Sequence, residues 1–342
     1  MSGTQSLRIL FCLALAVSGA ARAADRVEII WPTPNPAWAE GRPLADYVQH
    51  AGSGEPESGT FGGVRSGGTR FHEGIDMKCL ARDRRGEPAD SVFAAMNGIV
   101  RHINSSAGDS NYGRYIVLEH PEQTPAVYTL YAHLARIAPG LREGAVVKRG
   151  DVLGLMGHSS GGYMIPVDRA HLHFEIGLMI TRDFETWYAR KKFGSRNDHG
   201  AWNGMNLMGI DPLDFLNAWR ARRVDTFQDY FSKMTTAVRI RIATHRVPDF
   251  AARYPSLLTK PIPLGGVAGW EIRCNWTGVP FSWTPLTALE VLGAQPDQPQ
   301  FVEVNADLLK REHSKSIAVS RRGTWTAGKD LEIVLQQLFG LK

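Results

Sequence analysis

Two histidines and a glutamate alternate with apolar residues between positions 170 and 176 of the chain. His171, His173 and Glu175 occupy every second position, and leucine, phenylalanine and isoleucine follow them. This period of two is typical of a half-buried strand and places both imidazoles on one face. Two imidazoles on one face can share a metal ion or a reaction, although such a pair alone is more often two solvent-facing histidines.

A second polar group, His72 and Asp76, lies about a hundred residues upstream. Residues four apart share a face on a strand and also on a helix. Gly74 between them disfavours a helix interior, and on a strand it would leave room between the two side chains. Two imidazoles and one carboxylate are a common catalytic zinc set that leaves the fourth position to water. His133, in an apolar run from 127 to 134, supplies a further imidazole.

Together these motifs resemble the lysostaphin-type (LytM-type) zinc endopeptidases, which cut the peptide cross-links of peptidoglycan. The resemblance runs from about residue 58 to residue 216 and includes the connecting segments 59–62, 113–120, 147–154 and 157–161. It implies a mainly β fold, an antiparallel lysostaphin-like sheet of the duplicated-hybrid-motif type with the metal in a groove. It also implies that His72, Asp76 and His173 bind one zinc ion per chain.

The same resemblance gives catalytic roles to two more histidines. His171 matches the general base, and His133 matches the residue that positions the water or stabilises the oxyanion. Glu175 lies on the histidine face, but the resemblance gives it at most a structural role. The implied function is an exported zinc metalloendopeptidase acting on peptidoglycan stem peptides and cross-links. Some relatives lose their metal ligands and activate a cell-wall amidase, so a non-catalytic regulator is the alternative; the presence of all five site residues argues against it.

The N-terminus has the composition of a secretory signal peptide, residues 1–23. A short apolar run is followed by Ala21-Arg22-Ala23, which predicts cleavage after Ala23. The run is too short for a retained membrane anchor, and no other apolar stretch is long enough to cross a membrane. We therefore expect a periplasmic or secreted protein. The net charge of +5 favours attraction to anionic polymers of the cell envelope. The sequence has no basic patch interleaved with aromatic residues that would indicate nucleic-acid binding.

Short strands broken by Gly, Asn and Asp predict an antiparallel β arrangement for a catalytic domain at 58–216. Residues 91–102 read as two strands joined by a tight Asn97-Gly98 turn. Three further parts are a lead-in (24–57), an insertion (181–209) with a short helix at 186–192, and a C-terminal module (217–342). The C-terminal module is predicted as α+β, with strands at 237–243 and 269–276 and a helix at 330–341, and it could bind an envelope protein. Cys79 and Cys274 could pair in an oxidising compartment, which the sequence leaves open.

Overall fold

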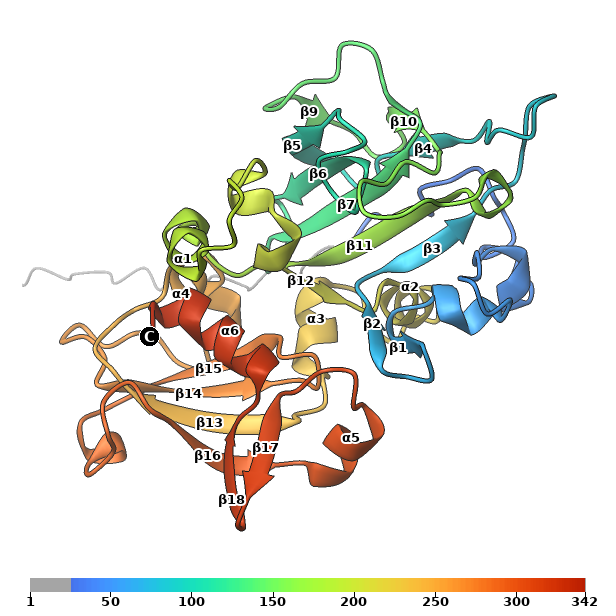
Figure 1. Ribbon diagram of the computed structural model, residues 1–342. Helices are drawn as coiled ribbons and strands as arrows, with labels where there is room; N and C mark the ends of the chain where they lie inside the picture. The colour runs from blue at the N-terminus through green and yellow to red at the C-terminus, as the bar shows by residue number, and fades with distance from the viewer. Residues whose placement is uncertain (1–25, 342) are drawn as a thin grey trace, which may run out of the picture.

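The computed structural model describes residues 26–341, so the predicted signal peptide lies outside the described residues. A seven-stranded antiparallel sheet forms the centre of the molecule (Figure 1). β3 (Ile75–Lys78) and β12 (Leu207–Ile210) pair with different halves of β11 (His171–Met179), along His171–Phe174 and Ile176–Met179. The order along the sheet is β12 (Leu207–Ile210), β11 (His171–Met179), β7 (Val127–Leu134), β6 (Arg114–His120), β5 (Gly98–Asn104) and β9 (Val146–Val147), with β3 (Ile75–Lys78) beside β11.

Two smaller sheets flank the central one. The first has the order β4 (Ser91–Phe93), β10 (Val152–Leu155), β8 (Arg136–Ile137), and the second pairs β1 (Gly62–Arg65) with β2 (Arg70–His72). The predicted hairpin at 91–102 is wrong, because β4 pairs with β10 whereas β5 pairs with β6 and β9. The segment between them crosses from one sheet to the other: buried Ala94 donates its N–H to the Asp151 carbonyl, and exposed Asn97 accepts the Arg149 N–H at Oδ1.

The alternation in β11 divides its two faces between core and cavity. Leu172, Phe174 and Ile176 are fully buried in the main hydrophobic core, together with Phe215 of α2 (Pro212–Arg220). Helix α2 begins where Asp211 caps it by accepting hydrogen bonds from the N–H groups at positions 213 and 214. The opposite face carries His171, His173 and Glu175. The packed side therefore fixes the strand that carries the histidines.

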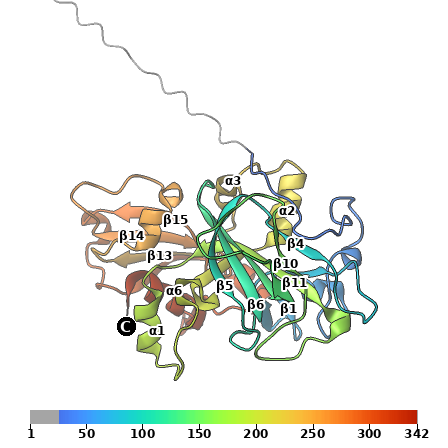
Figure 2. The ribbon, with the colours of Figure 1, turned by 90° about the horizontal axis from the view of Figure 1, so that it is seen from above.

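The C-terminal module is a four-stranded antiparallel sheet with helices, and it lies beside the central sheet in both views (Figures 1 and 2). Its strands are β15 (Pro280–Leu286), β14 (Gly269–Cys274), β13 (Val238–Ala243) and β16 (Pro299–Val304), with the hairpin β17 (Ala318–Arg321) and β18 (Thr324–Ala327). Its helices are α3 (Phe227–Ser232), α4 (Asp249–Arg253), α5 (Ala306–Arg311) and α6 (Lys329–Phe339). Buried residues from Val27 to Phe339 form one continuous hydrophobic cluster, so the two sheets share a core.

The lead-in and the insertion also pack onto this framework. Trp38 of the lead-in is buried, stacks on Trp31 at 5.3 Å and donates from Nε1 to Asn217 Oδ1 at 3.0 Å. The predicted helix of the insertion is α1 (Phe184–Lys191), whose buried aromatic side chains pack against Ile333 of α6. The mainly antiparallel β fold is thus confirmed.

Both cysteines of the described part are buried and free, with no disulfide between Cys79 and Cys274. Within residues 26–341 every helix is too short or too polar to cross a lipid bilayer.

Candidate metal centre

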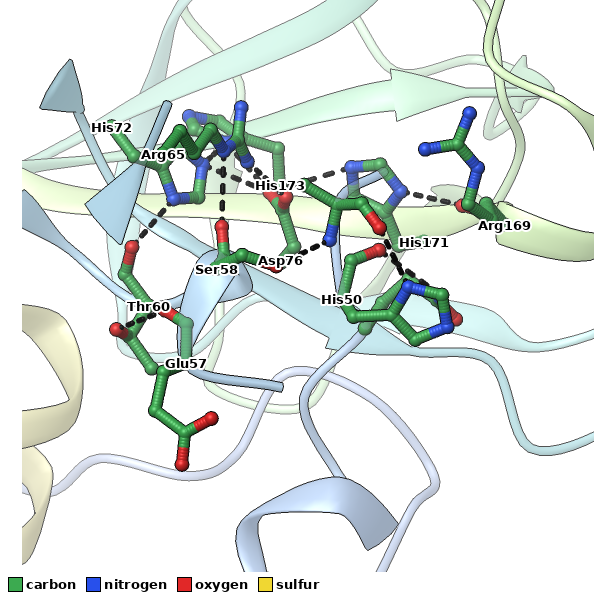
Figure 3. A network of polar contacts seen from close by, with 12 residues as sticks. His50, Glu57, Ser58, Thr60, Arg65, His72, Asp76, Arg169, His171 and His173 are labelled. Carbon is green, nitrogen blue, oxygen red and sulfur yellow. Dashed lines mark hydrogen bonds and ion pairs between the residues drawn. The ribbon is translucent and has the colours of Figure 1, made fainter. Parts of the chain in front are cut away.

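Three of the site residues meet where β2, β3 and β11 come together (Figure 3). His72 is the last residue of β2, and Asp76 of β3 stands opposite His173 of β11 in the strand ladder. His72 Nε2 lies 3.0 Å from both His173 Nδ1 and Asp76 Oδ1, and His173 Nδ1 lies 3.1 Å from Asp76 Oδ1. All three side chains are buried. Among the residues that the structure describes, they are the one group of three whose potential ligand atoms converge in this way.

The local backbone differs from the single strand expected through His72 and Asp76. The chain turns at Glu73 and Gly74, and the two ligand candidates lie on separate strands. A Cβ atom at Gly74 would lie 2.3 Å from the Phe174 carbonyl oxygen, closer than real Cβ contacts come. Glycine is therefore required for close packing of this turn against β11, rather than to leave room between the ligands.

Each of the two candidate ligand imidazoles is oriented through its other nitrogen. His72 Nδ1 lies 2.7 Å from the Thr60 carbonyl oxygen, to which it donates, so Nε2 carries the lone pair. His173 Nε2 donates to Glu175 Oε1 at 2.9 Å, so the lone pair of the neutral ring is on Nδ1. Ligand atoms about 2.0–2.1 Å from a tetrahedral zinc ion lie about 3.3 Å from one another. The donor atoms and their spacing of 3.0–3.1 Å therefore fit zinc, with a fourth position open.

His171 lies beside this group on the same face of β11. Its Nδ1 donates to the Arg169 carbonyl oxygen at 2.7 Å, and its Nε2 lies 3.3 Å from Asp76 Oδ1. Its ring centroid is 4.9 Å from that of His133. The lone pair on Nε2 thus faces the space next to the ligand group.

His133 reaches the site through an exception to strand alternation. In the ladder, Ala132 of β7 stands opposite His173, so regular alternation would turn His133 to the far face, with Tyr131. His133 instead has a φ of +60°, a left-handed conformation that is unusual for a residue other than glycine. The ring consequently lies 5.8 Å from that of His173, and Nδ1 donates to the Ser159 carbonyl oxygen at 2.8 Å. A backbone held in this region at a cost of about 1–3 kcal/mol points to a functional constraint.

Burial and mutual charge set the protonation of the cluster. Burial alone would raise the pKa of Asp76, but the charges and hydrogen bonds of the surrounding histidines hold that pKa well below its ordinary value. Burial lowers the pKa of His72 and, with His171 and His173 adding to the effect, places the pKa of His133 well below its ordinary value. Burial also opposes protonation of His173, but Asp76 and Glu175 on either side outweigh it and raise that pKa to about 9.

Two further groups complete the centre: Arg65, which was not identified from the sequence, and Glu175, for which the resemblance implied at most a structural role. Arg65 of β1 donates from Nη2 to Asp76 Oδ2 at 2.5 Å and from Nε to the Ser58 carbonyl at 3.0 Å, which leaves Asp76 Oδ1 facing the imidazoles. Glu175, expected to be structural at most, accepts three hydrogen bonds. They come from His173 Nε2, Tyr112 Oη (2.6 Å) and Tyr128 Oη (2.8 Å). Its place on the histidine face was the one sequence feature that pointed to this contact.

The centre opens into a cavity of about 1390 Å³ that contains all five predicted site residues. The loop 161–170 contributes Tyr163 and Met164, both exposed, to its rim. His120 is buried and structural, as expected: its Nδ1 donates to the Asn97 carbonyl at 2.6 Å. His158 lies outside the cavity, where Nε2 is 3.2 Å from Glu87 Oε2.

Comparison with known proteins agrees with the motifs. Residues 70–182 match the model of peptidase family M23. No curated protein sequence matches the chain significantly. Solved structures with some likeness include a zinc-containing peptidase from Vibrio cholerae (27% identity, 31% of this chain and 26% of that one, TM-score 0.24). A putative glycyl-glycine endopeptidase LytM from Ruminococcus gnavus has 32% identity over 33% of this chain and 42% of that one, with a TM-score of 0.27.

The catalytic domain of lysostaphin from Staphylococcus simulans is 19% identical over 51% of this chain and 95% of that one, with a TM-score of 0.30. The first two of these likenesses span less than half of the solved chains. The assignment rests on the family model and not on these structural likenesses. The match to the family M23 model includes the strands that carry His72, Asp76, His133, His171 and His173, so this part of the chain is similar to family M23 peptidases.

Proposed function

We propose that this protein is an exported zinc endopeptidase that hydrolyses the peptide cross-links of peptidoglycan. The observation that carries the proposal is the convergence of two imidazole nitrogens and one carboxylate oxygen within 4.8 Å, with two more imidazoles alongside, in a segment that matches family M23. Because the substrate lies outside the cytoplasm, the proposal requires export to the periplasm or beyond.

The ligand atoms in this proposal are His72 Nε2, Asp76 Oδ1 and His173 Nδ1. A zinc ion bound there would polarise the scissile carbonyl and lower the pKa of a water molecule towards neutrality. The protein holds these ligands in place through the Thr60 carbonyl, Glu175 and Arg65, so little reorganisation is needed on binding.

The two other histidines have different roles. His171 Nε2 takes a proton from the attacking water and delivers it to the amine that leaves, because its Nδ1 is engaged by the Arg169 carbonyl. His133 stays neutral, since burial lowers its pKa, and its Nδ1–H is engaged by the Ser159 carbonyl. His133 Nε2 is then an acceptor, which suits orientation of a water molecule better than donation to an oxyanion.

The first test concerns the ligands. We expect wild-type protein and His171→Ala to bind one zinc ion per chain, and His72→Ala to lose most of it. Zinc content measured by atomic emission decides this, with circular dichroism as the control for folding. Full zinc stoichiometry in His72→Ala would remove that residue from the ligand set.

The second test concerns the reaction. Purified sacculi are incubated with wild-type protein, with wild-type protein plus chelator, and with His171→Ala, and the released peptides are identified by mass spectrometry. Release of uncross-linked stem peptides by the untreated wild type alone is the expected result, and it identifies the bond. If zinc-loaded wild type releases nothing from sacculi or from soluble cross-linked peptides, the endopeptidase proposal is wrong and the amidase-regulator alternative takes its place.

A further inference from the structure

Part of the wall of the cavity around the candidate metal centre is formed by residues outside the segment 70–182 that matches family M23. The C-terminal module contributes Thr277, Lys315 and one side of α6, and the insertion contributes residues of α1 and of the segment that follows it. In Figure 1 the helix α6 lies between α1 and the strands of the C-terminal module. The C-terminal module is therefore part of the candidate active site rather than a remote attachment.

Contacts with the β1–β2 hairpin fix this wall relative to the metal centre. The ring of Trp276 lies 5.8 Å from that of Phe71, the residue before His72. Lys315 Nζ stands 4.2 Å from the centroid of the Phe71 ring, a cation–π contact. A Cβ atom at Gly63 would lie 2.7 Å from Ser314 Oγ, which shows how closely the hairpin and the wall approach each other.

Lys315 and Lys329 belong to two segments that are bonded together. Gly328 N–H donates to the Ile317 carbonyl at 2.9 Å, and Asp330 N–H donates to the Ser316 carbonyl at 3.0 Å. The Asp330 carboxylate accepts the Ser316 N–H at 2.7 Å. The backbone segments that carry Lys315 and Lys329 are thus adjacent, and both residues line the cavity.

The cavity carries an excess of unpaired positive charge. Among residues 26–341, five cations that line it have no carboxylate oxygen within ion-pair distance: Arg70, Arg169, Lys191, Lys315 and Lys329. Of the acidic residues that line it, Asp76 is paired with Arg65, and Asp198 with Arg196. Glu73, Asp109 and Asp330 remain, and a bound zinc ion would add to the excess. A cavity of this charge attracts anions.

We propose that Lys315 and Lys329 bind a free carboxylate of the substrate, so that the enzyme selects cross-links between carboxylate-bearing stem peptides over neutral glycine bridges. This inference rests on the endopeptidase function proposed above. Lys315 is half-buried and held against Phe71, so little side-chain entropy remains to be lost on binding. A neutral oligoglycine chain offers the two ammonium groups only uncharged carbonyl oxygens, whereas a carboxylate forms stronger, charge-assisted hydrogen bonds with them.

The test compares two soluble cross-linked peptides of the same sequence, one with free carboxylates and one with those carboxylates amidated; a glycine-bridged peptide is the third substrate. Wild-type zinc-loaded protein is compared with Lys315→Gln, Lys329→Gln and the double variant. Lys310→Gln, an exposed lysine on α5 outside the cavity, is the matched control. Each substitution at the wall should raise KM for the free-carboxylate peptide about three- to tenfold and leave kcat and zinc content unchanged.

The wild type should cleave the amidated peptide less efficiently, and the double variant should lose this preference. Equal cleavage of the free and amidated peptides by the wild type, or faster cleavage of the glycine-bridged peptide, would overturn the inference. Binding of the same peptides to zinc-loaded His171→Ala by calorimetry tests the wall without hydrolysis. If binding depends on the free carboxylates but the wild type cleaves none of the peptides, the carboxylate site at Lys315 and Lys329 stands and the endopeptidase function is refuted. If amidation does not change binding, the carboxylate site is refuted.

Discussion

Replacing Glu175 by glutamine tests whether the hydrogen bond to His173 orients a metal ligand. Glu175 is 1% exposed and accepts from His173 Nε2 at 2.9 Å, on the side of the ring opposite the ligand atom Nδ1. Glutamine keeps the size and one acceptor oxygen but removes the negative charge. Hydrogen bonds to a charged partner are about twice as strong as neutral ones, so the ring becomes a weaker and less fixed ligand.

The expected magnitude follows from the loss of this single contact. Loss of a group that orients a ligand histidine costs about 10- to 100-fold in metal affinity, or about 1.4–2.7 kcal/mol. We therefore expect the Kd for zinc to rise by that factor in Glu175→Gln. Competition with a fluorescent zinc chelator measures it, and thermal unfolding of the zinc-free protein shows whether the fold is retained.

Two further variants separate orientation from general damage. Glu57→Gln, whose exposed carboxylate points away from the cluster in Figure 3, should bind zinc as the wild type does. Tyr128→Phe removes one of the two phenols on Glu175 but keeps the carboxylate–histidine bond, so it should raise the Kd for zinc measurably, by less than tenfold. A Kd for zinc in Glu175→Gln within threefold of the wild-type value would refute the orienting role of Glu175. If Glu175→Gln does not fold, Tyr128→Phe decides: normal folding with an unchanged Kd would argue against a role of the Tyr128–Glu175–His173 hydrogen bonds in zinc binding.

The remaining predictions concern the framework. Trp38→Ala should destabilise the protein by about 3–5 kcal/mol in urea unfolding, because it opens a cavity between the lead-in and Asn217; a loss below 1 kcal/mol would contradict this packing. Asp211→Ala should cost about 1 kcal/mol through loss of the α2 cap, whereas Asp211→Asn, which keeps the acceptor, should cost little. Burial lowers the pKa of His120 to about 4 from 6.5, so the folded state disfavours its charged form. The contribution of neutral His120 to the free energy of unfolding should be fully present above pH 6.5. It should fall by up to about 3 kcal/mol as the pH drops towards 4, and His120→Gln should reduce this pH dependence.

The alternation along β11 predicts the face shared by His171, His173 and Glu175, and the structure agrees. Apolar spacing also predicts α6 to within about two residues. His133 could not be placed this way, because regular alternation turns it away from the site and its positive φ leaves no trace in the residue pattern. Arg65 is one arginine among many until the pairing of β1 with β2 brings it to Asp76. Long-range pairing likewise decides that β4 and β5 enter different sheets, which a local turn motif cannot reveal.

The shared core changes how the role of the C-terminal module can be studied. Trp270 and Trp283 of the module are fully buried and belong to the same cluster as Phe174 and Phe215 of the central region. Deleting the C-terminal module would expose this surface, so loss of activity in a truncated protein would not distinguish a binding role from unfolding. Substitutions at Lys315 and Lys329 leave the buried tryptophan core in place. Lys315→Gln removes the contact with the Phe71 ring as well as a charge, whereas Lys329→Gln, at an exposed side chain, changes only the charge. They can therefore separate substrate recognition from structural support.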